Sequence, residues 1–509
     1  MKIKDIKIID ILQDGRGVGK ADSKVYFIEK AIFGEICDIE IINKKKNFIE
    51  AKKIKTKKQS CHYKQPPCPY YYECGGCSIM DINYQSQIDL KKNLIKNALE
   101  KSSKIEIDDI EMLKSKELGY RNKIRLKITQ EGNLAYNKKY SNDLVKIKDC
   151  LLAKDLIREN LGQIENITKE ISKKYPDSLE EITIRASEKE ILLNIKIKDE
   201  KIISYIKNQY KDSTYNINLI NKKETINISG KDYIIYNLLG KKFKISMNDF
   251  YQVNDYMTEK LYKTAKNFLG ENQKVLDLFC GSATSSIAIN DDHVVGIEIN
   301  KNAIKDAKEN AKINGLKDYK FIAKNAKYID NKFIKKEKID AIVLDPPRAG
   351  LDKEIIKTIA KTKIKKLVYI SCNPQTLARD INRFQNQGYK LEKIKACDMF
   401  SQTMHVEVIT LLSKLDSKKY ISVELPMGDM DLTSAESKAT YKQIQNYVLE
   451  KFGFKVSTLY IAQVKKKHGL EVREHYNISK NEKQKIPQCP IEKEEAILDA
   501  LKHFKMVYY

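Results

Sequence analysis

From about residue 243 onward, the sequence alternates regularly between short apolar strands and amphipathic helices. The strand segments read KVLDLF, VVGIEI, YKFIAK, IDAIVLD and KLVYIS, and helical segments such as NKNAIKDAKENAKIN and QTLARDINRFQNQ separate them. Strands that are apolar throughout are typical of a parallel sheet with helices on both faces. The alternation therefore predicts an α/β domain, which we place at residues 243–415.

Polar side chains stand near the ends of the predicted strands. They are Asp277, Glu298, Asp345 and Cys372. Because parallel strands end at a common edge, where α/β sheets bind ligands, we expect these side chains to share one site. A cysteine inside an apolar strand is usually a buried filler, but Cys372 leaves its strand into the polar turn SCNPQ. Its thiol would therefore be presented to a bound ligand.

The segment VLDLFCGSATSSIAI predicts a strand, a turn at Gly281 and a helix, and the next strand ends at Glu298. A carboxylate in that place can accept hydrogen bonds from both hydroxyls of a ribose. Ala283 replaces the second glycine of a dinucleotide fingerprint. The pattern therefore favours a nucleoside cofactor without a pyrophosphate, such as S-adenosylmethionine. Asp345 precedes two stiffening prolines and would either accept from the N–H edge of a heterocycle or cap the turn.

Three further regions surround this domain. Short alternating strands over residues 1–58 predict a small OB-type β-barrel. Residues 59–242 combine a cysteine-rich stretch, a helix and a strand-rich part with a hairpin at residues 131–133, which indicates an α+β central domain. Residues 416–509 predict a mostly helical extension. A first helix would begin at residues 433–436 and end at Gly453, and a second would begin at Ser457 and end at Gly469. A third helix would lie at the end of the extension. That extension would be either a helix-turn-helix or a small bundle without a nucleic-acid role.

The charge favours a polyanionic partner, because the formal net charge is +25. Only nine of the 94 basic residues are arginine, so a generic solvated lysine surface is the alternative. No apolar run is long enough for a membrane span, and the first residues lack a signal peptide. We therefore expect a cytoplasmic protein without membrane contact, in which the ten cysteines are thiols, metal ligands or a nucleophile rather than disulfides.

Several motifs taken together resemble the RNA uracil-5-methyltransferases. DFYQVN, DLFCG, GIEIN, LDPPRAGL, SCNPQTLARD and FSQTMHVE follow one another in the order and near the spacing of that family. DGRGVGK resembles its TRAM barrel, CPYYYECGGC its iron-sulfur motif and GYRNKIRLKI its central domain, so the resemblance covers about residues 1–413. It implies that residues 243–415 form a Rossmann-like S-adenosylmethionine-dependent methyltransferase domain.

The resemblance assigns roles to individual residues. Cys372 would add to carbon 6 of uracil, because carbon 5 is a poor nucleophile until a thiolate has made the ring an enolate. Glu407 would then remove the proton from carbon 5. The positions that match cofactor contacts are Gln252, Phe279, Glu298, Asn325 and Asp345, with Thr284 and Arg348 as weaker matches. His405 would either orient Glu407 or pack in the interior.

A second set of residues concerns a metal. Cys68, Cys74, Cys77 and Cys150 could hold zinc or iron by ligand softness alone. The resemblance favours a structural four-iron four-sulfur cluster. Cys61 precedes the motif and is an alternative to Cys68 as a ligand.

The expected partner is RNA, and we expect the enzyme to be a monomer. The barrel and cluster motif resemble the enzymes of large-subunit rRNA, so 23S rRNA is the first expected substrate and tRNA the second. A uracil in folded RNA must lie in a loop or be flipped out to reach Cys372, with Arg121 and Arg125 as candidates for holding flanking RNA. A non-catalytic RNA-binding factor is the alternative from another class, although it would not need both a nucleophile and a base.

Overall fold

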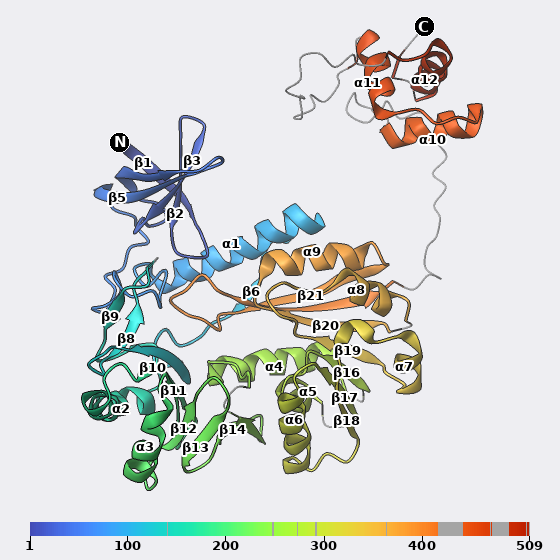
Figure 1. The fold of residues 1–509 in the computed structure, drawn as a ribbon. Helices are drawn as coiled ribbons and strands as arrows, with labels where there is room; N and C mark the ends of the chain where they lie inside the picture. The colour runs from blue at the N-terminus through green and yellow to red at the C-terminus, as the bar shows by residue number, and fades with distance from the viewer. Residues whose placement is uncertain are drawn as a thin grey trace. The chain divides into compact units, whose positions relative to one another are not determined.

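The computed structural model describes residues 1–139, 141–246, 249–271, 273–290, 293–362, 364–415, 441–468, 470, 488–504 and 506–507. The chain divides into two compact units, Met1–Lys419 and Tyr420–Tyr509 (Figure 1). The first unit contains a β-barrel and mixed α/β layers, and the second is helical.

The first five strands close into a barrel. Their bounds are β1 Lys2–Ile11, β2 Gly17–Ala21, β3 Lys24–Glu29, β4 Ile36–Lys44 and β5 Ile49–Lys58. The order is β1-β2-β3-β5-β4, and β4 pairs with β1 to close the ring. Alternate residues such as Ile6, Ile8 and Ile39 fill the interior. This closed barrel agrees with the OB-type architecture that the sequence predicts.

A seven-stranded sheet follows, in the order β13-β12-β11-β10-β7-β8-β9. Its bounds are β7 Lys123–Ile128, β8 Leu134–Asn137, β9 Leu144–Lys146, β10 Leu179–Ala186, β11 Ile191–Ile197, β12 Asn216–Ile220 and β13 Thr225–Ser229. The helices of this part are α2 Asp155–Lys174, η1 Glu200–Ile202 and α3 Ile203–Tyr210. The predicted hairpin joins β7 to β8, with Gly132 at a φ of 83° in the turn. A separate pair, β14 Tyr233–Leu238 and β15 Lys241–Ser246, comes next.

The second sheet has eight strands in the order β18-β17-β16-β19-β20-β22-β21-β6. Its bounds are β6 Glu111–Leu113, β16 Val275–Leu278, β17 Val294–Glu298, β18 Tyr319–Ala323, β19 Ala341–Leu344, β20 Lys366–Ser371, β21 Tyr389–Cys397 and β22 Glu407–Lys414. β16 to β20 are parallel, as the alternation predicts, and β22 runs antiparallel to β20. The order reverses at β16 and β19, which makes their carboxyl ends a ligand-binding edge.

Helices cover both faces of this sheet (Figure 1). The helices are α1 Tyr84–Ser103, α4 Asp255–Leu269, α5 Thr284–Ile289, α6 Lys301–Ile313, η2 Ala326–Tyr328, α7 Asn331–Lys336, α8 Lys353–Ala360 and α9 Pro374–Gln385. One core contains apolar side chains of α1, α7, α8 and α9, and the other contains those of α4, α5 and α6. Two elements from the range 59–242, α1 and β6, thus belong to the layers of this sheet.

The C-terminal unit contains α10 Tyr441–Phe452, α11 Thr458–Lys467 and α12 Ile491–His503 around a core that includes Ile444, Ile461 and Ile497. Ser457 caps α11 as predicted, because its side chain accepts from the Tyr460 N–H. The predicted helix start at residues 433–436 and the stop at Gly469 lie outside the described residues. Among the helices of the described residues, none is both long and apolar enough to cross a membrane.

Candidate active site

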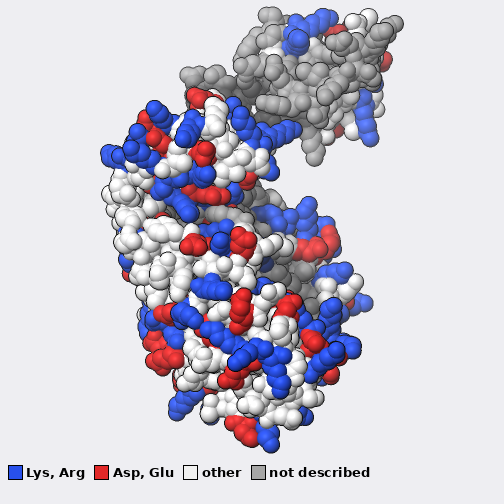
Figure 2. Space-filling model, turned by 60° about the vertical axis from the view of Figure 1, so that its left-hand side comes forward, with Lys and Arg blue, Asp and Glu red and all other residues white. Residues whose placement is uncertain are grey.

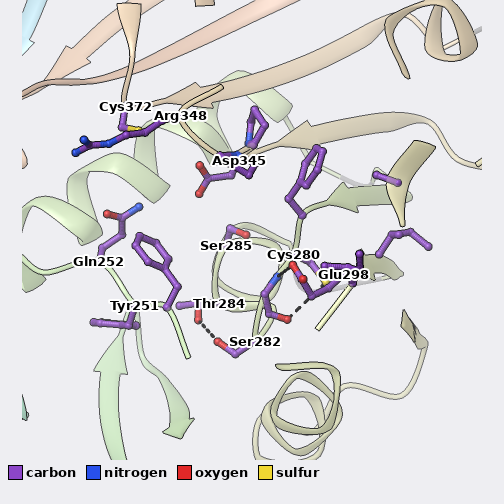
Figure 3. A pocket seen from close by; sticks show the side chains of 18 of the residues that line it. Tyr251, Gln252, Cys280, Ser282, Thr284, Ser285, Glu298, Asp345, Arg348 and Cys372 are labelled. Atoms are coloured by element: carbon purple, nitrogen blue, oxygen red, sulfur yellow. Dashed lines mark hydrogen bonds between the residues drawn. The ribbon is translucent and has the colours of Figure 1, made fainter. Parts of the chain in front are cut away.

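A cavity of about 510 Å³ lies at the carboxyl edge of the eight-stranded sheet. It is lined by all seven residues to which the sequence assigns catalytic or cofactor roles: Gln252, Phe279, Glu298, Asn325, Asp345, Cys372 and Glu407. Figure 3 shows Cys372 and Arg348 at one end, Glu298 towards the other and Asp345 between them. The topology explains the convergence, because Glu407 begins β22, the antiparallel strand that starts at the edge where β20 ends.

Cys372 directly follows β20 and precedes Asn373, the residue that caps α9. Burial and the charge of Glu407 raise the pKa of the Cys372 thiol to about 11, although Arg348 opposes this shift. The Arg348 carbonyl accepts hydrogen bonds from Asn373 Nδ2 and Thr376 Oγ1, which keeps this residue beside the start of α9. A guanidinium and a helix N-terminus both favour a thiolate. The site therefore holds a protonated thiol together with groups that stabilise its ionised form.

Two carboxyl groups that line the cavity, those of Asp345 and Glu407, act on one another. Burial raises the pKa of Asp345 to about 7, with a contribution from Asp277. Burial also raises the pKa of Glu407 well above its usual range, Asp345 adds to the shift and Arg348 opposes it. Acids whose pKa values are raised by burial are candidates for proton transfer.

The turn after β16 forms the other end of the cavity. Phe279, Gly281 and Ala283 have φ values of 70°, 53° and 61°. Ala283 thus takes a left-handed conformation that glycine adopts without strain, so the substitution noted in the sequence leaves the turn intact. The Gly281 N–H donates to Glu298 Oε2 over 3.3 Å (Figure 3). The Asn300 N–H donates to Glu298 Oε1 over 2.8 Å. The Glu298 carboxylate is thereby fixed at the cavity wall.

Gln252 has an unused acceptor. Its backbone carbonyl accepts from Asn122 Nδ2, and the residue is 3% exposed. Its Oε1 atom is buried and has no hydrogen-bond partner among the described residues. A buried polar atom without a partner is costly, so a ligand that donates to it would be favoured.

The structure adds lining residues that sequence reasoning missed, namely Phe250, Tyr251, Tyr262, Ser282, Ser285 and Phe400. The serines could have been found, since they follow the glycine turn in the same motif. Thr284 lines the cavity, with its Oγ1 3.1 Å from Ser282 Oγ. His405 packs edge-on against Phe400 with ring centroids 6.1 Å apart, and among the described residues no hydrogen bond joins it to Glu407.

The four predicted metal ligands line one small cavity. Cys68, Cys74, Cys77 and Cys150 share it with residues that include Tyr136 and Arg121. Burial raises the pKa of Cys77, and the three other thiols add to this shift, which indicates that the four sulfurs are close together. All four are free thiols. Cys61 is exposed and does not line this cavity.

Among the described residues, no group of three or more His, Cys, Asp or Glu side chains is arranged to hold a metal ion. A cluster of several irons is larger than one ion and binds its thiolates farther apart. The guanidinium Nε of Arg121, beside these thiols, is buried and has no partner in the described parts of the chain. Four cysteine sulfurs beside a buried guanidinium nitrogen are a donor set that an anionic iron–sulfur cluster would fit.

A groove of about 790 Å³ adjoins the active-site cavity and shares Arg348 and Phe400 with it. Its lining includes Arg121, Lys138 and Lys139. Arg125 is not part of this lining, and its guanidinium pairs with Glu181. On the face seen in Figure 2, Lys and Arg are interspersed with Asp and Glu, so charge alone does not mark a binding surface there.

Comparisons with known proteins agree with this architecture. Residues 83–415 match the family model described as tRNA (Uracil-5-)-methyltransferase. A protein of Clostridium tetani named an uncharacterized RNA methyltransferase is 33% identical over 80% of this chain and 95% of its own length. One of Caldanaerobacter subterraneus with the same description is 32% identical over 81% of this chain and 99% of its own length.

Among solved structures, the tRNA (uracil-54, C5)-methyltransferase of Pyrococcus abyssi in complex with S-adenosyl-L-homocysteine is similar, with a TM-score of 0.66 and 26% identity. The match covers 80% of this chain and 99% of that one. Because the family model spans more than half of the sequence and the relatives match nearly end to end, the chain belongs to the RNA uracil-5-methyltransferase family.

Proposed function

We propose that this RNA methyltransferase transfers the methyl group of S-adenosylmethionine to carbon 5 of a specific uridine in 23S rRNA. The observation that carries the proposal is the single cavity that joins the thiol of Cys372, the buried acid Glu407 and a ribose-type carboxylate, Glu298. A binding protein without catalysis would not need these three groups around one space.

The cofactor would occupy the end of the cavity at the Gly281 turn. Glu298 would accept from the ribose hydroxyls, and Asn325 and Phe279 would flank the nucleoside. The free acceptor of Gln252 and the Asp345 carboxyl would face the methionine part or the uracil edge. The S-adenosyl-L-homocysteine in the Pyrococcus abyssi structure supports this class of cofactor. When bound, the cofactor would supply an electrophilic methyl group.

The Cys372 thiolate adds to carbon 6 of the uracil, forming a carbon–sulfur bond while the electrons of the C5=C6 bond move toward oxygen 4. Carbon 5 of this enolate would accept the methyl group that the cofactor supplies when bound, and S-adenosylhomocysteine would leave with the electron pair of the broken sulfonium bond. Arg348 stabilises the thiolate before addition.

The Glu407 carboxylate then takes the proton from carbon 5. The electrons of that C–H bond restore the C5=C6 bond, and the carbon–sulfur pair returns to Cys372. Glu407 reaches its ionised form more easily when the Arg348 charge is beside it, since Arg348 lowers its pKa. Without this step the enzyme would remain bonded to its RNA.

The four-cysteine cavity is proposed to hold a four-iron four-sulfur cluster that ties the cysteine-rich segment to the central domain. Protein purified without oxygen is expected to contain about four irons per chain. Cys68→Ser should lose this iron and its visible absorbance, whereas the exposed Cys61→Ser should keep both. Equal iron loss in the two variants would contradict the ligand set.

Large-subunit rRNA is proposed as the substrate because the barrel resembles the TRAM domain of enzymes that act on it. Transfer RNA is the second candidate, since the similar solved structure is an enzyme named for tRNA. The groove with Arg121, Lys138 and Lys139 would hold nucleotides on either side of the flipped uridine.

The test uses radiolabelled S-adenosylmethionine with unmodified 23S rRNA and, separately, unmodified tRNA. Wild-type protein should label carbon 5 of one or a few uridines in 23S rRNA, and Cys372→Ala should label none. Cys489→Ala, a cysteine of the C-terminal unit, is the matched control and should retain full labelling. Labelling of tRNA alone would move the substrate to the second candidate. Absence of label in both RNAs would contradict methyl transfer.

A further inference from the structure

The connection between β21 and β22, residues 398–406, ends at Glu407 and is unusually buried for a loop. Asp398, Met399 and Ser401 are fully buried, and Gln402 is 2% exposed. Phe400, in the same loop, lines both the active-site cavity and the adjoining groove. A buried loop must satisfy its own polar groups, so its partners determine its conformation.

Gln402 is the strained point of this loop, with a φ of 68°. Its backbone N–H donates to Gln87 Oε1 over 3.1 Å, and Gln87 Nε2 donates to Gln402 Oε1 over 2.9 Å. Its carbonyl accepts from the backbone N–H groups of Ser78 and Ile79, over 3.0 and 3.2 Å. A left-handed backbone conformation is unfavourable for a residue other than glycine and persists only where its surroundings fix it.

The partners of Gln402 include the cysteine-rich segment itself. Ser78 directly follows Cys77, whose thiol lines the four-cysteine cavity. The Met404 N–H donates to Ser78 Oγ over 3.1 Å, three residues before Glu407. Gln87 Nε2 also donates to the carbonyls of Ile79 and Ile82, over 3.0 and 2.8 Å. One hydrogen-bond network thus connects the cysteine segment, α1 and the loop that ends at the proposed base.

The loop is also held at its other end. The buried Lys91 of α1 donates to Asp398 Oδ1 and to the Phe400 carbonyl, and Tyr84 donates to Asp398 Oδ2. The segment from Asp398 to Phe400 is therefore fixed independently of Ser78. Removal of the Gln402 network would loosen only the half of the loop next to Glu407.

We propose that Gln402, held by Gln87 and Ser78, is a positioning residue for Glu407 and couples the four-cysteine segment to the release of methylated RNA. The proposal rests on the proposed function, because release is the step that needs the base. When the network is intact, Glu407 lies where it can take the proton from carbon 5. When it is broken, methyl transfer continues but the covalent RNA adduct of Cys372 persists.

The first experiment follows that adduct as an SDS-stable enzyme–RNA complex in a single turnover. Gln87→Leu removes both hydrogen bonds between Gln87 and Gln402 and is expected to slow the disappearance of the adduct about tenfold. Ser78→Ala should act in the same direction, about threefold. Gln85→Leu, the same substitution on the exposed face of α1, should behave as wild type. A merely destabilised protein would lose activity without accumulating adduct.

The second experiment does not depend on catalysis. Coupling is reciprocal, so a broken network should also loosen the cysteine segment. Loss of the visible cluster absorbance to an iron chelator, without RNA, is expected to be severalfold faster in Gln87→Leu and Ser78→Ala than in wild type or Gln85→Leu.

The outcomes separate the two proposals. If Glu407→Gln retains the adduct but Gln87→Leu and Ser78→Ala release it at the wild-type rate, the positioning role is wrong and the proposed function stands. If Glu407→Gln itself releases the adduct at the wild-type rate, the proposal that Glu407 is the base is wrong. Unchanged cluster loss in both network variants would overturn the coupling to the cysteine segment.

Discussion

At the scale of single residues, the site combines a thiol that is hard to ionise with a cation beside it. Burial is the main cause that raises the pKa of Cys372 to about 11, and Arg348 opposes this shift. Because the thiolate is the nucleophile, alkylation of Cys372 by iodoacetamide should rise about tenfold per pH unit between about pH 7 and pH 10. Mass spectrometry of the Cys372 peptide gives this rate.

Arg348→Gln removes the stabilising charge and should slow this alkylation about three- to tenfold at a fixed pH. The exposed Cys61 in the same sample is the internal control, since it lies outside the cavity. An unchanged Cys372 rate in the variant would show that Arg348 does not act on the thiol.

The protonation of Asp345 affects the free energy of unfolding of the protein. Its pKa rises from 3.8 to about 7 in the folded protein, so the folded state holds a proton that the unfolded chain releases between these pH values. The free energy of unfolding therefore falls as pH increases through this window and is constant above it. Asp345→Asn, which carries no charge, should be more stable than wild type by about 1 to 3 kcal/mol at pH 8, discounted for water in the cavity.

Thermal unfolding from pH 5 to pH 8 measures this difference. The advantage of Asp345→Asn should shrink as pH falls toward 5, while methylation is lost at every pH. A constant advantage across this range would contradict a buried, titrating carboxyl group.

At the scale of elements, strand β17, which ends at Glu298, has no space for a larger side chain at Gly296. A Cβ atom on Gly296 of β17 would lie 2.5 Å from Phe321 Cδ1 and 2.8 Å from Cys280 Sγ. Gly296→Ala should destabilise the fold by about 1 to 3 kcal/mol through overpacking. It should also weaken binding of S-adenosylhomocysteine, because Glu298 lies two residues farther along the strand.

Gly162→Ala is the matched control. Gly162 lies in α2 with no atom within 4 Å of the added Cβ. The substitution should stabilise the protein by about 0.5 to 1 kcal/mol and leave cofactor binding unchanged. Calorimetric titration and thermal unfolding of the two variants test both expectations, and equal cofactor affinity in Gly296→Ala would contradict the role of β17.

The local sequence pattern predicted most elements of the eight-stranded sheet, but not all of them. The apolar strands and amphipathic helices of the sheet are where the alternation predicts them, because periodicity is a local property. The three-residue β6 was not predicted. It pairs in parallel with β21, about 280 residues later, and three residues carry no periodic signal.

At the scale of the whole molecule, the second compact unit has its own apolar core. Deletion of residues 418–509 should therefore leave methylation chemistry intact, because the active-site cavity is lined only by residues of the first unit. We expect a modestly weaker affinity for RNA, measured by filter binding at fixed salt, since the lost residues add basic charge. Unchanged affinity would contradict a role of the extension in RNA binding.

The sequence by itself determined the alternating α/β domain, the barrel and seven of the side chains that line the cavity, because strand ends and motifs can be recognised from neighbouring residues. The tertiary structure alone decided which groups act on one another. The pKa of Cys372 depends on Glu407 and Arg348, and the loop before Glu407 depends on Gln87 and Ser78, more than 300 residues away. Such contacts arise from the packing of distant elements, and no local pattern encodes the distance between them.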